Sequence, residues 1–179
     1  MRIFRLLAAL LDYPADDMLA ALRVEAADPA KFVAIEDAAG VLGAEDHTTL
    51  AAFITELLAA EPAERQAEYV QTFDLTAEHA LHLTHHLFGE EKTRGPALID
   101  LGEFYRSYGL KADERELPDF LPLMLEFVST LGLDEARVFL ADVAKVLSVL
   151  AANLEKSASR YAPLLRIVEQ QGSLARLAA

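Results

Sequence analysis

Four closely spaced histidines, His79, His82, His85 and His86, are the side chains in this sequence with the clearest potential for chemistry. Imidazole nitrogens bind zinc, nickel and copper, and residues three or four positions apart share one face of a helix. On a helix, the first, second and fourth of these histidines would form a row, with Glu78 off the centre of their face. The sequence offers no firm fourth ligand beside them. We therefore expect no obligatory metal here, and assign the histidines to packing or to contact with a partner.

The sequence lacks the groups of residues that support hydrolysis or phosphoryl transfer. It contains no Gly-x-Ser-x-Gly and no His-Glu-x-x-His pattern. The segment Gly89-Glu90-Glu91-Lys92-Thr93 lacks both the spacing of a phosphate-binding loop and a preceding strand. Because catalysis needs a nucleophile or base in a defined setting, we expect a protein that binds and does not turn over a substrate.

The charge of the chain is strongly acidic, with 16 Lys+Arg against 29 Asp+Glu and a formal net charge of −13. Such a chain is a poor ligand for nucleic acid, whose phosphates require basic contacts. The acidic residues could form an ordinary solvated surface, or a rim around an apolar groove that orients a helical partner. They concentrate at Glu61, Glu64, Glu68, Glu90, Glu91, Asp100, Glu103, Asp113, Glu114, Glu116 and Asp119.

Apolar residues recur at helical spacing along nearly the whole chain, and no run alternates as a strand would. Alanine and leucine dominate while the chain has only 8 glycines, which is typical of a helical protein. The sequence therefore predicts an all-α fold, a helical bundle forming one domain over residues 1–179. The helices are expected at 2–11, 16–26, 28–40, 46–60, 61–73, 96–108, 134–156 and 159–170, with a further one opening in the segment 118–122.

Two of these elements carry more specific expectations. The 134–156 helix has apolar residues in steps of three or four and valines on other faces. We therefore expect it to be the most buried helix of the bundle. Pro118 and Pro122 mark the start of the helix that follows them, with Asp119 available to accept hydrogen bonds from its free N–H groups. Residues 172–179 are expected to form a mobile tail.

The compartment is also constrained by the sequence. The first apolar run, Leu6–Leu11, is too short for a secretory signal, and no later segment has the roughly 18 uncharged residues of a membrane helix. The chain has no cysteine, so it forms no disulfide and holds no iron–sulfur cluster on thiolates. We expect a soluble, cytoplasmic protein without an integral membrane segment and without a cofactor of its own.

The segment Glu-Leu-Pro-Asp-x-Leu-Pro-x-x-Leu-Glu-Phe at residues 116–127 resembles the signature of the nitrate reductase delta subunit family, the NarJ-type molybdoenzyme assembly chaperones of the TorD-like group. Further blocks are similar to that family in the same order. In one departure, Phe120 stands where the family often has histidine, so no role of that imidazole carries over. The further blocks are Leu10–Pro14, Tyr69–Asp74, His86–Glu90, Arg94–Leu101 and Ser159–Ala162.

This resemblance implies a TorD-like helical fold and a dedicated chaperone. Its partner would be the apo catalytic subunit of a respiratory, membrane-bound nitrate reductase, bound through its N-terminal segment. The chaperone would assist insertion of the molybdenum cofactor before the subunit docks at the membrane. Alternatives are a chaperone for another molybdoenzyme, or a metal-binding protein built on the histidines. The oligomeric state stays open, a homodimer included.

The matches to the family also suggest where the peptide would bind. The Tyr-x-x-x-Phe and Leu-Pro-Asp elements motivate the placement, and Met124 would provide an adaptable apolar contact. The sequence does not decide which of these side chains face outward. The expected groove consists of Tyr69, Phe73, Leu87, Phe88, Leu121, Met124 and Leu125, with Glu116 and Asp119 at its edge.

Overall fold

The computed structural model describes residues 1–88, 92–110 and 116–177, and the side chains of these residues as far as Leu174. Within these ranges the chain forms ten α-helices and no β-strand; one isolated antiparallel bridge joins His82 and Phe120. The predicted all-α fold is therefore confirmed. None of the described helices is both long enough and apolar enough to cross a membrane.

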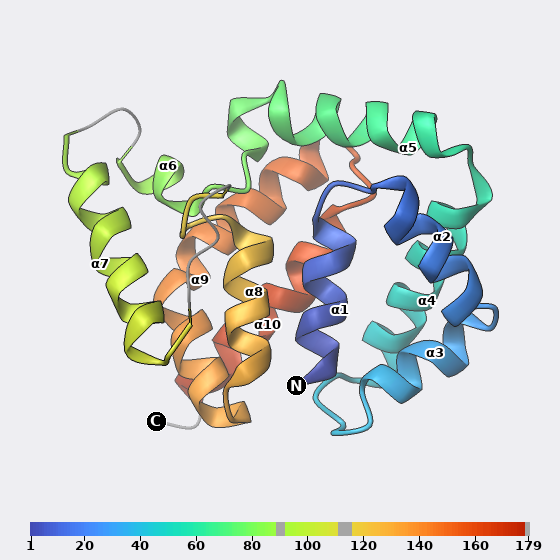
Figure 1. Cartoon of the computed structure of the whole chain (residues 1–179), viewed down its shortest axis with the longest axis horizontal. Coiled ribbons are helices and arrows are strands. Elements are labelled where there is room, and N and C mark those ends of the chain that lie inside the picture. The colour runs from blue at the N-terminus through green and yellow to red at the C-terminus, as the bar shows by residue number, and fades with distance from the viewer. Residues whose placement is uncertain (89–91, 111–115, 178–179) are drawn as a thin grey trace.

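Figure 1 shows the arrangement of the helices, coloured in chain order. One turn, η1, is a π-helix and another, η2, is a 3₁₀-helix. The bounds are α1 (Arg2–Leu11), α2 (Asp16–Glu25), α3 (Pro29–Glu36), α4 (Ala44–Ala59), α5 (Pro62–Tyr69), η1 (Val70–Asp74), η2 (Ala77–His79), α6 (Leu83–Phe88), α7 (Arg94–Ser107), α8 (Leu121–Thr130), α9 (Leu133–Lys156) and α10 (Ala162–Leu177).

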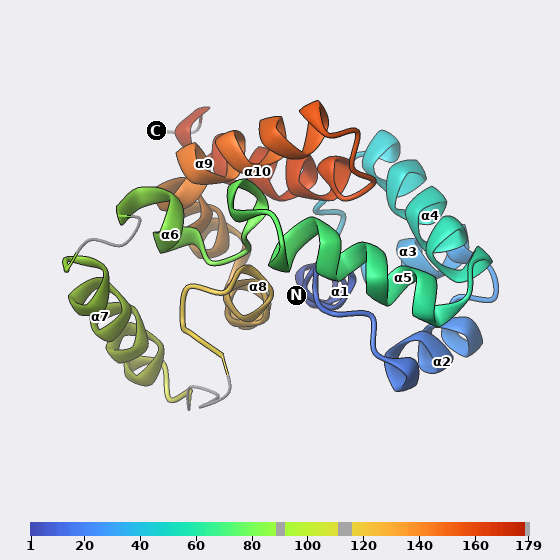
Figure 2. The same ribbon diagram turned by 90° about the horizontal axis from the view of Figure 1, so that it is seen from above.

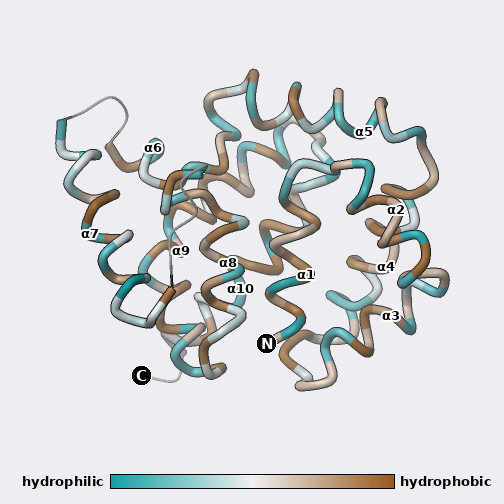
Figure 3. The backbone as a smooth tube through the Cα atoms, in the orientation of Figure 1, coloured by the Kyte–Doolittle hydropathy of each residue, from teal (hydrophilic) through white to brown (hydrophobic). Residues whose placement is uncertain are grey.

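The centre of the molecule is formed by α1 and α8, which lie side by side and are seen nearly end-on in Figure 2. They run antiparallel, because the ammonium group of Met1 donates a hydrogen bond to the carbonyl of Ser129 near the far end of α8. Hydrophobic residues recur along these central helices (Figure 3), and burial of such side chains is the main driving force for folding. The buried residues of α1 are Ile3, Phe4, Leu6, Leu7, Ala8, Leu10 and Leu11.

The long helix α9 forms a hairpin with α10 and buries only one of its faces. Leu140 and Leu147 are fully buried, whereas Val138 and Val149 are 60% and 54% exposed. Eight of the 24 residues of α9 are buried, against seven of ten in α1, so the expectation that the 134–156 helix is the most buried element is wrong. The reason is that its apolar residues form a stripe and leave the opposite face to solvent.

The turn between α9 and α10 closes the long helix with a specific hydrogen-bonding pattern. The N–H of Ser159 donates to the carbonyl of Leu154 at 2.9 Å, and that of Ala158 to Glu155 at 3.0 Å. These two bonds define a Schellman motif, whose left-handed position is usually glycine. Here that position is Ala158, with φ of 53°. The hairpin therefore turns through a backbone conformation that is unfavourable for alanine.

Several helix limits differ from those expected from the sequence. The 61–73 helix is interrupted, because α5 ends at Tyr69 and the chain continues as the π-turn η1. Pro122 lies in the first turn of α8 as predicted, but α8 begins at Leu121 and not at Pro118. Asp119 makes no cap on α8, because its carboxylate accepts hydrogen bonds from Thr84 instead. Residues 172–177 belong to α10, and the mobility expected there stays a prediction.

Candidate functional site: a buried aspartate beside an apolar cleft

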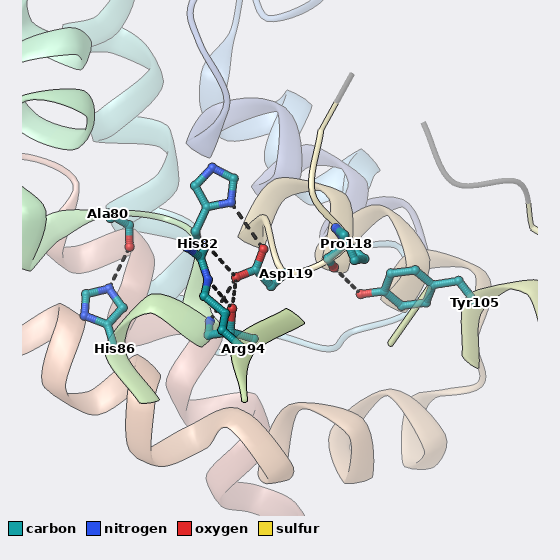
Figure 4. A network of polar contacts seen from close by, with 8 residues as sticks. Ala80, His82, His86, Arg94, Tyr105, Pro118 and Asp119 are labelled. Atoms are coloured by element: carbon teal, nitrogen blue, oxygen red, sulfur yellow. Dashed lines mark hydrogen bonds and ion pairs between the residues drawn. The ribbon is translucent and has the colours of Figure 1, made fainter. Parts of the chain in front are cut away.

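Asp119 is the centre of a polar network that joins three segments of the chain (Figure 4). Its side chain is buried, and its Oδ2 accepts hydrogen bonds from the N–H of Thr84 at 3.0 Å and from the Thr84 hydroxyl. Nδ1 of His82 lies 3.3 Å from the other carboxylate oxygen. Nη2 of Arg94 lies 3.7 Å from Oδ2, while its Nε donates to the Thr84 hydroxyl at 3.0 Å. Asp119 thus connects the starts of α6 and α7 to the start of α8.

Backbone hydrogen bonds strengthen the same junction. The N–H of Leu83 donates to the carbonyl of Asp119 at 3.0 Å, and the N–H of Leu121 donates to Leu81 at 2.9 Å. From α7, the Tyr105 hydroxyl donates to the carbonyl of Pro118 at 2.9 Å (Figure 4). These contacts fix α6 and α7 against the segment that precedes α8.

The charge state of Asp119 follows from its surroundings. Burial raises the pKa of its carboxyl group, but hydrogen bonds from His82 and Thr84 outweigh burial and hold this pKa below its ordinary value of 3.8. The carboxylate is therefore ionised at neutral pH. The side chain is buried and anchors the junction of α6, α7 and α8, and its expected place at the edge of a peptide groove stays a prediction.

The four histidines do not share one helix, so the row that a single helix would give does not form. His79 lies in η2, His82 lies in the link before α6, and the other two lie in α6. The link is extended because it pairs with the segment around Phe120 through the isolated bridge. This pairing separates His79 from the histidines of α6.

Two of these histidines form hydrogen bonds with backbone carbonyls. Nδ1 of His79 lies 3.1 Å from the carbonyl of Thr72, and Nε2 of His86 lies 2.7 Å from that of Ala80. Since a carbonyl only accepts, each of these nitrogens carries a hydrogen and is not free to bind a metal. Among the described residues, no three His, Cys, Asp or Glu side chains are grouped as metal ligands would be. That the protein needs no metal stays a prediction.

Next to the Asp119 network, an apolar cleft of about 340 Å³ opens between α6, α7, α8 and α9. Its walls are mainly hydrophobic, and two of its large side chains are accessible: Leu87 is 57% exposed and Phe104 is 39% exposed. An accessible apolar hollow of this kind is typical of a binding site. It is lined by Leu83, Thr84, Leu87, Asp100, Leu101, Phe104, Asp119, Met124, Phe139, Asp142 and Val143.

A second group of large side chains, the aromatic cluster, lies where α1, α4, η1 and α10 meet. It consists of Tyr13, Phe53, Tyr69, Phe73 and Tyr161, with the Phe73 and Tyr161 rings 4.8 Å apart. The Tyr69 hydroxyl donates to the carbonyl of Leu11 at 3.3 Å. Burial raises the pKa of the Tyr69 hydroxyl and is the main cause that raises that of Tyr161 to about 12. Four of its five side chains are buried, whereas Tyr13 is 43% exposed and borders a separate hollow.

The structure does not bring the nine predicted groove residues together. Leu87, Asp119 and Met124 line the cleft, whereas Tyr69 and Phe73 belong to the aromatic cluster. The buried Leu121 and Leu125 belong to the core, and Phe88 is half-buried in α6. Glu116 is exposed and borders a different hollow, beside Asp12 and Tyr13. Which of the nine contact a partner stays a prediction.

Sequence reasoning missed the part of the cleft that α7 and α9 contribute. Leu101 and Phe104 are three residues apart on α7, and Phe139 and Asp142 are three apart on α9. The sequence shows this helical spacing, but the spacing does not indicate that α7 and α9 face each other. The other acidic positions expected at a rim, Glu90, Glu91, Asp113 and Glu114, lie outside the described residues.

The described residues thus form an all-helical fold with an accessible apolar cleft. The chain belongs to the nitrate reductase delta subunit family, whose match extends over residues 39–166. The family expected from the sequence is therefore confirmed.

Individual relatives agree with this assignment. The chain is 40% identical over 124 residues to the nitrate reductase molybdenum cofactor assembly chaperone NarJ of Escherichia coli (strain K12), covering 69% of this chain and 52% of the relative. It is 34% identical over 174 residues to the probable chaperone NarW of the same strain, covering 97% and 69%. It is 38% identical over 100 residues to the probable NarJ of Bacillus subtilis (strain 168), covering 56% and 54%. The chain thus spans about half the length of the NarJ relatives, and all three are described as assembly chaperones, not enzymes.

Proposed function

We propose that this protein is an assembly chaperone for a nitrate reductase and assists insertion of the molybdenum cofactor into the catalytic subunit. The observation that carries the proposal is the similarity to NarW along 97% of the chain, together with membership of the delta subunit family. An all-helical protein with an accessible apolar cleft suits a chaperone, whose task is to hold another chain.

We further propose that the cleft holds the N-terminal segment of the apo catalytic subunit as an amphipathic helix, in the cytoplasm and before that subunit docks at the membrane. The cleft presents apolar side chains from four helices, which match the apolar face of a helical ligand. Burial of Leu87 and Phe104 against that face would supply most of the binding free energy, since both are accessible in the free protein.

The exposed residue Leu87 gives a clean test of this site. Truncation of Phe73 or Leu121 would be ambiguous, because both are buried and their loss would damage the fold. Leu87→Ala removes an exposed side chain from the cleft wall, and Ile99→Ala removes one that is 61% exposed on α7 and does not line the cleft. We expect Leu87→Ala to weaken binding of the N-terminal client peptide about tenfold and Ile99→Ala to leave it unchanged.

The measurement is titration calorimetry with the peptide from the nitrate reductase catalytic subunit of the same organism, with circular dichroism as the control for folding. Equal affinities for the two variants would exclude the cleft as the binding site. No binding to the parent protein would contradict the client assignment. Copurification of the untagged catalytic subunit with the tagged protein would then distinguish nitrate reductase from another molybdoenzyme as the client.

A further inference from the structure

Two carboxylates border the apolar cleft from different helices. Asp100 lies in the interior of α7 and Asp142 in the interior of α9, and both are exposed. Neither stands in the first turn of its helix, where an acidic residue would stabilise the helix dipole. The helix dipole therefore does not explain their position beside a hydrophobic hollow.

Neither carboxylate is neutralised by another described residue. Asp100 has the like charge of Glu103 three residues further on and forms no ion pair within the described chain. Lys145 stands three residues after Asp142, but no ion pair joins these two described side chains. Arg94, at the start of α7, is already engaged by Asp119 and Thr84. Among the described residues, these two carboxylates thus have no ion-pair partner, and most of the other side chains that line the cleft are apolar.

We propose that Asp100 and Asp142 select the client segment by its charge, binding a Lys or Arg that lies within one turn of the apolar anchors. This inference rests on the proposed function, because it assigns charge selectivity to the same cleft. An unpaired carboxylate beside a hydrophobic surface favours a cationic partner group and disfavours an anionic one, so it sets orientation and specificity. On a helix, a basic residue three or four positions from an apolar anchor reaches the rim while the anchor fills the cleft.

The test combines a charge-neutral protein variant with a charge-neutral peptide. The double variant Asp100→Asn and Asp142→Asn keeps side-chain size and removes both charges. Glu103→Gln is the matched control, because Glu103 is exposed on α7 and does not line the cleft. The probes are the N-terminal client peptide and the same peptide with each Arg replaced by citrulline and each Lys by acetyl-lysine. Affinity is measured by calorimetry at low and at physiological salt.

We expect the double variant to bind the unmodified peptide about fivefold to tenfold more weakly, since each exposed charge pair contributes about 0–1 kcal/mol. The neutral peptide should bind the parent and the double variant equally, and Glu103→Gln should behave like the parent. The salt dependence of binding should also decrease in the double variant.

The outcomes separate the two proposals. Binding of the unmodified peptide with equal affinity to the parent, the double variant and Glu103→Gln would overturn the charge selection and leave the cleft intact as the site. A loss of equal size for Glu103→Gln would overturn it as well, because the effect would then be general electrostatics. Absence of peptide binding to the parent would overturn the proposed function and this inference with it.

Discussion

The aromatic cluster and the apolar cleft are both built from large hydrophobic side chains, but they differ in what surrounds them. In the cluster, Tyr69 and Phe73 are each only 4% exposed and their rings contact other rings of the same core. In the cleft, Phe104 stacks on Phe139 at 5.8 Å and still leaves 39% of its surface accessible. The buried rings of the cluster, Tyr13 apart, therefore complete their contacts within the chain, whereas large side chains of the cleft stay accessible.

This difference explains why the family motifs alone do not distinguish the accessible cleft from the buried core. The blocks around Leu11, Tyr69 and Tyr161 meet in the aromatic cluster, although they are far apart in the sequence. The block around Asp119 meets the segment of Thr84 and Arg94 beside the cleft. Motif residues thus stabilise the fold in the aromatic cluster and border the candidate site at the cleft. Only the exposure of the surrounding side chains distinguishes these two roles.

The largest expected effect is the difference in the free energy of unfolding between the variants Phe73→Ala and Phe104→Ala. Phe73 is buried among aromatic rings, so its truncation leaves a cavity and should lower the free energy of unfolding by about 3–5 kcal/mol. Phe104 is partly exposed, and its truncation should cost only about 1–2 kcal/mol of stability while weakening peptide binding. Urea unfolding and calorimetry on both variants measure the two effects. Equal losses of stability would refute the distinction between a closed core and an open cleft.

The second prediction concerns Asp119, the buried carboxylate that lines the cleft. Asp119→Asn should lower the free energy of unfolding by about 2 kcal/mol at pH 7, because an amide replaces a buried carboxylate that accepts from Thr84 and His82. The folded-state pKa of this carboxyl lies below its ordinary value of 3.8. The carboxylate therefore contributes its full stabilisation at pH values above the ordinary pKa of 3.8. This stabilisation is lost as the pH falls through the lower, folded-state pKa.

The pH dependence provides the control for this prediction. The difference in stability between the parent and Asp119→Asn should narrow as the pH decreases from neutral to below the ordinary value of 3.8, because the parent then becomes protonated at the same position. Urea unfolding across this range measures it. A difference that stays constant with pH would show that the variant acts through packing and not through the charge of the carboxylate.

Much of the fold follows from local patterns in the sequence, but the site does not. The periodicity of apolar residues located α1 at Arg2–Leu11, and Pro29 correctly marked the start of α3 after its cap Asp28. These features depend on neighbours in the sequence. The cleft depends on α7 facing α9, and the burial of Asp119 depends on pairing with a segment more than 30 residues away. No local pattern reports such contacts.

The smallest expected effect concerns the turn that carries Tyr161 into the aromatic cluster. Ala158 has φ of 53°, a left-handed conformation that is unfavourable by roughly 1–2 kcal/mol for a residue with a Cβ atom. Glycine adopts it without that strain, but its greater freedom in the unfolded chain offsets about 0.4–1 kcal/mol of the gain. Ala158→Gly should therefore raise the free energy of unfolding by about 0.5–1 kcal/mol.

The same substitution should change stability without changing peptide affinity. The Schellman hydrogen bonds from Ala158 and Ser159 remain available to glycine, so the turn and the position of Tyr161 should be retained. Since the turn does not line the cleft, peptide affinity should be unchanged while stability rises. Ala152→Gly, in the interior of α9, is the control that shows the ordinary destabilising effect of glycine in a helix, about 1 kcal/mol. If Ala158→Gly destabilised the protein as Ala152→Gly does, the left-handed turn would not be the strained element inferred here.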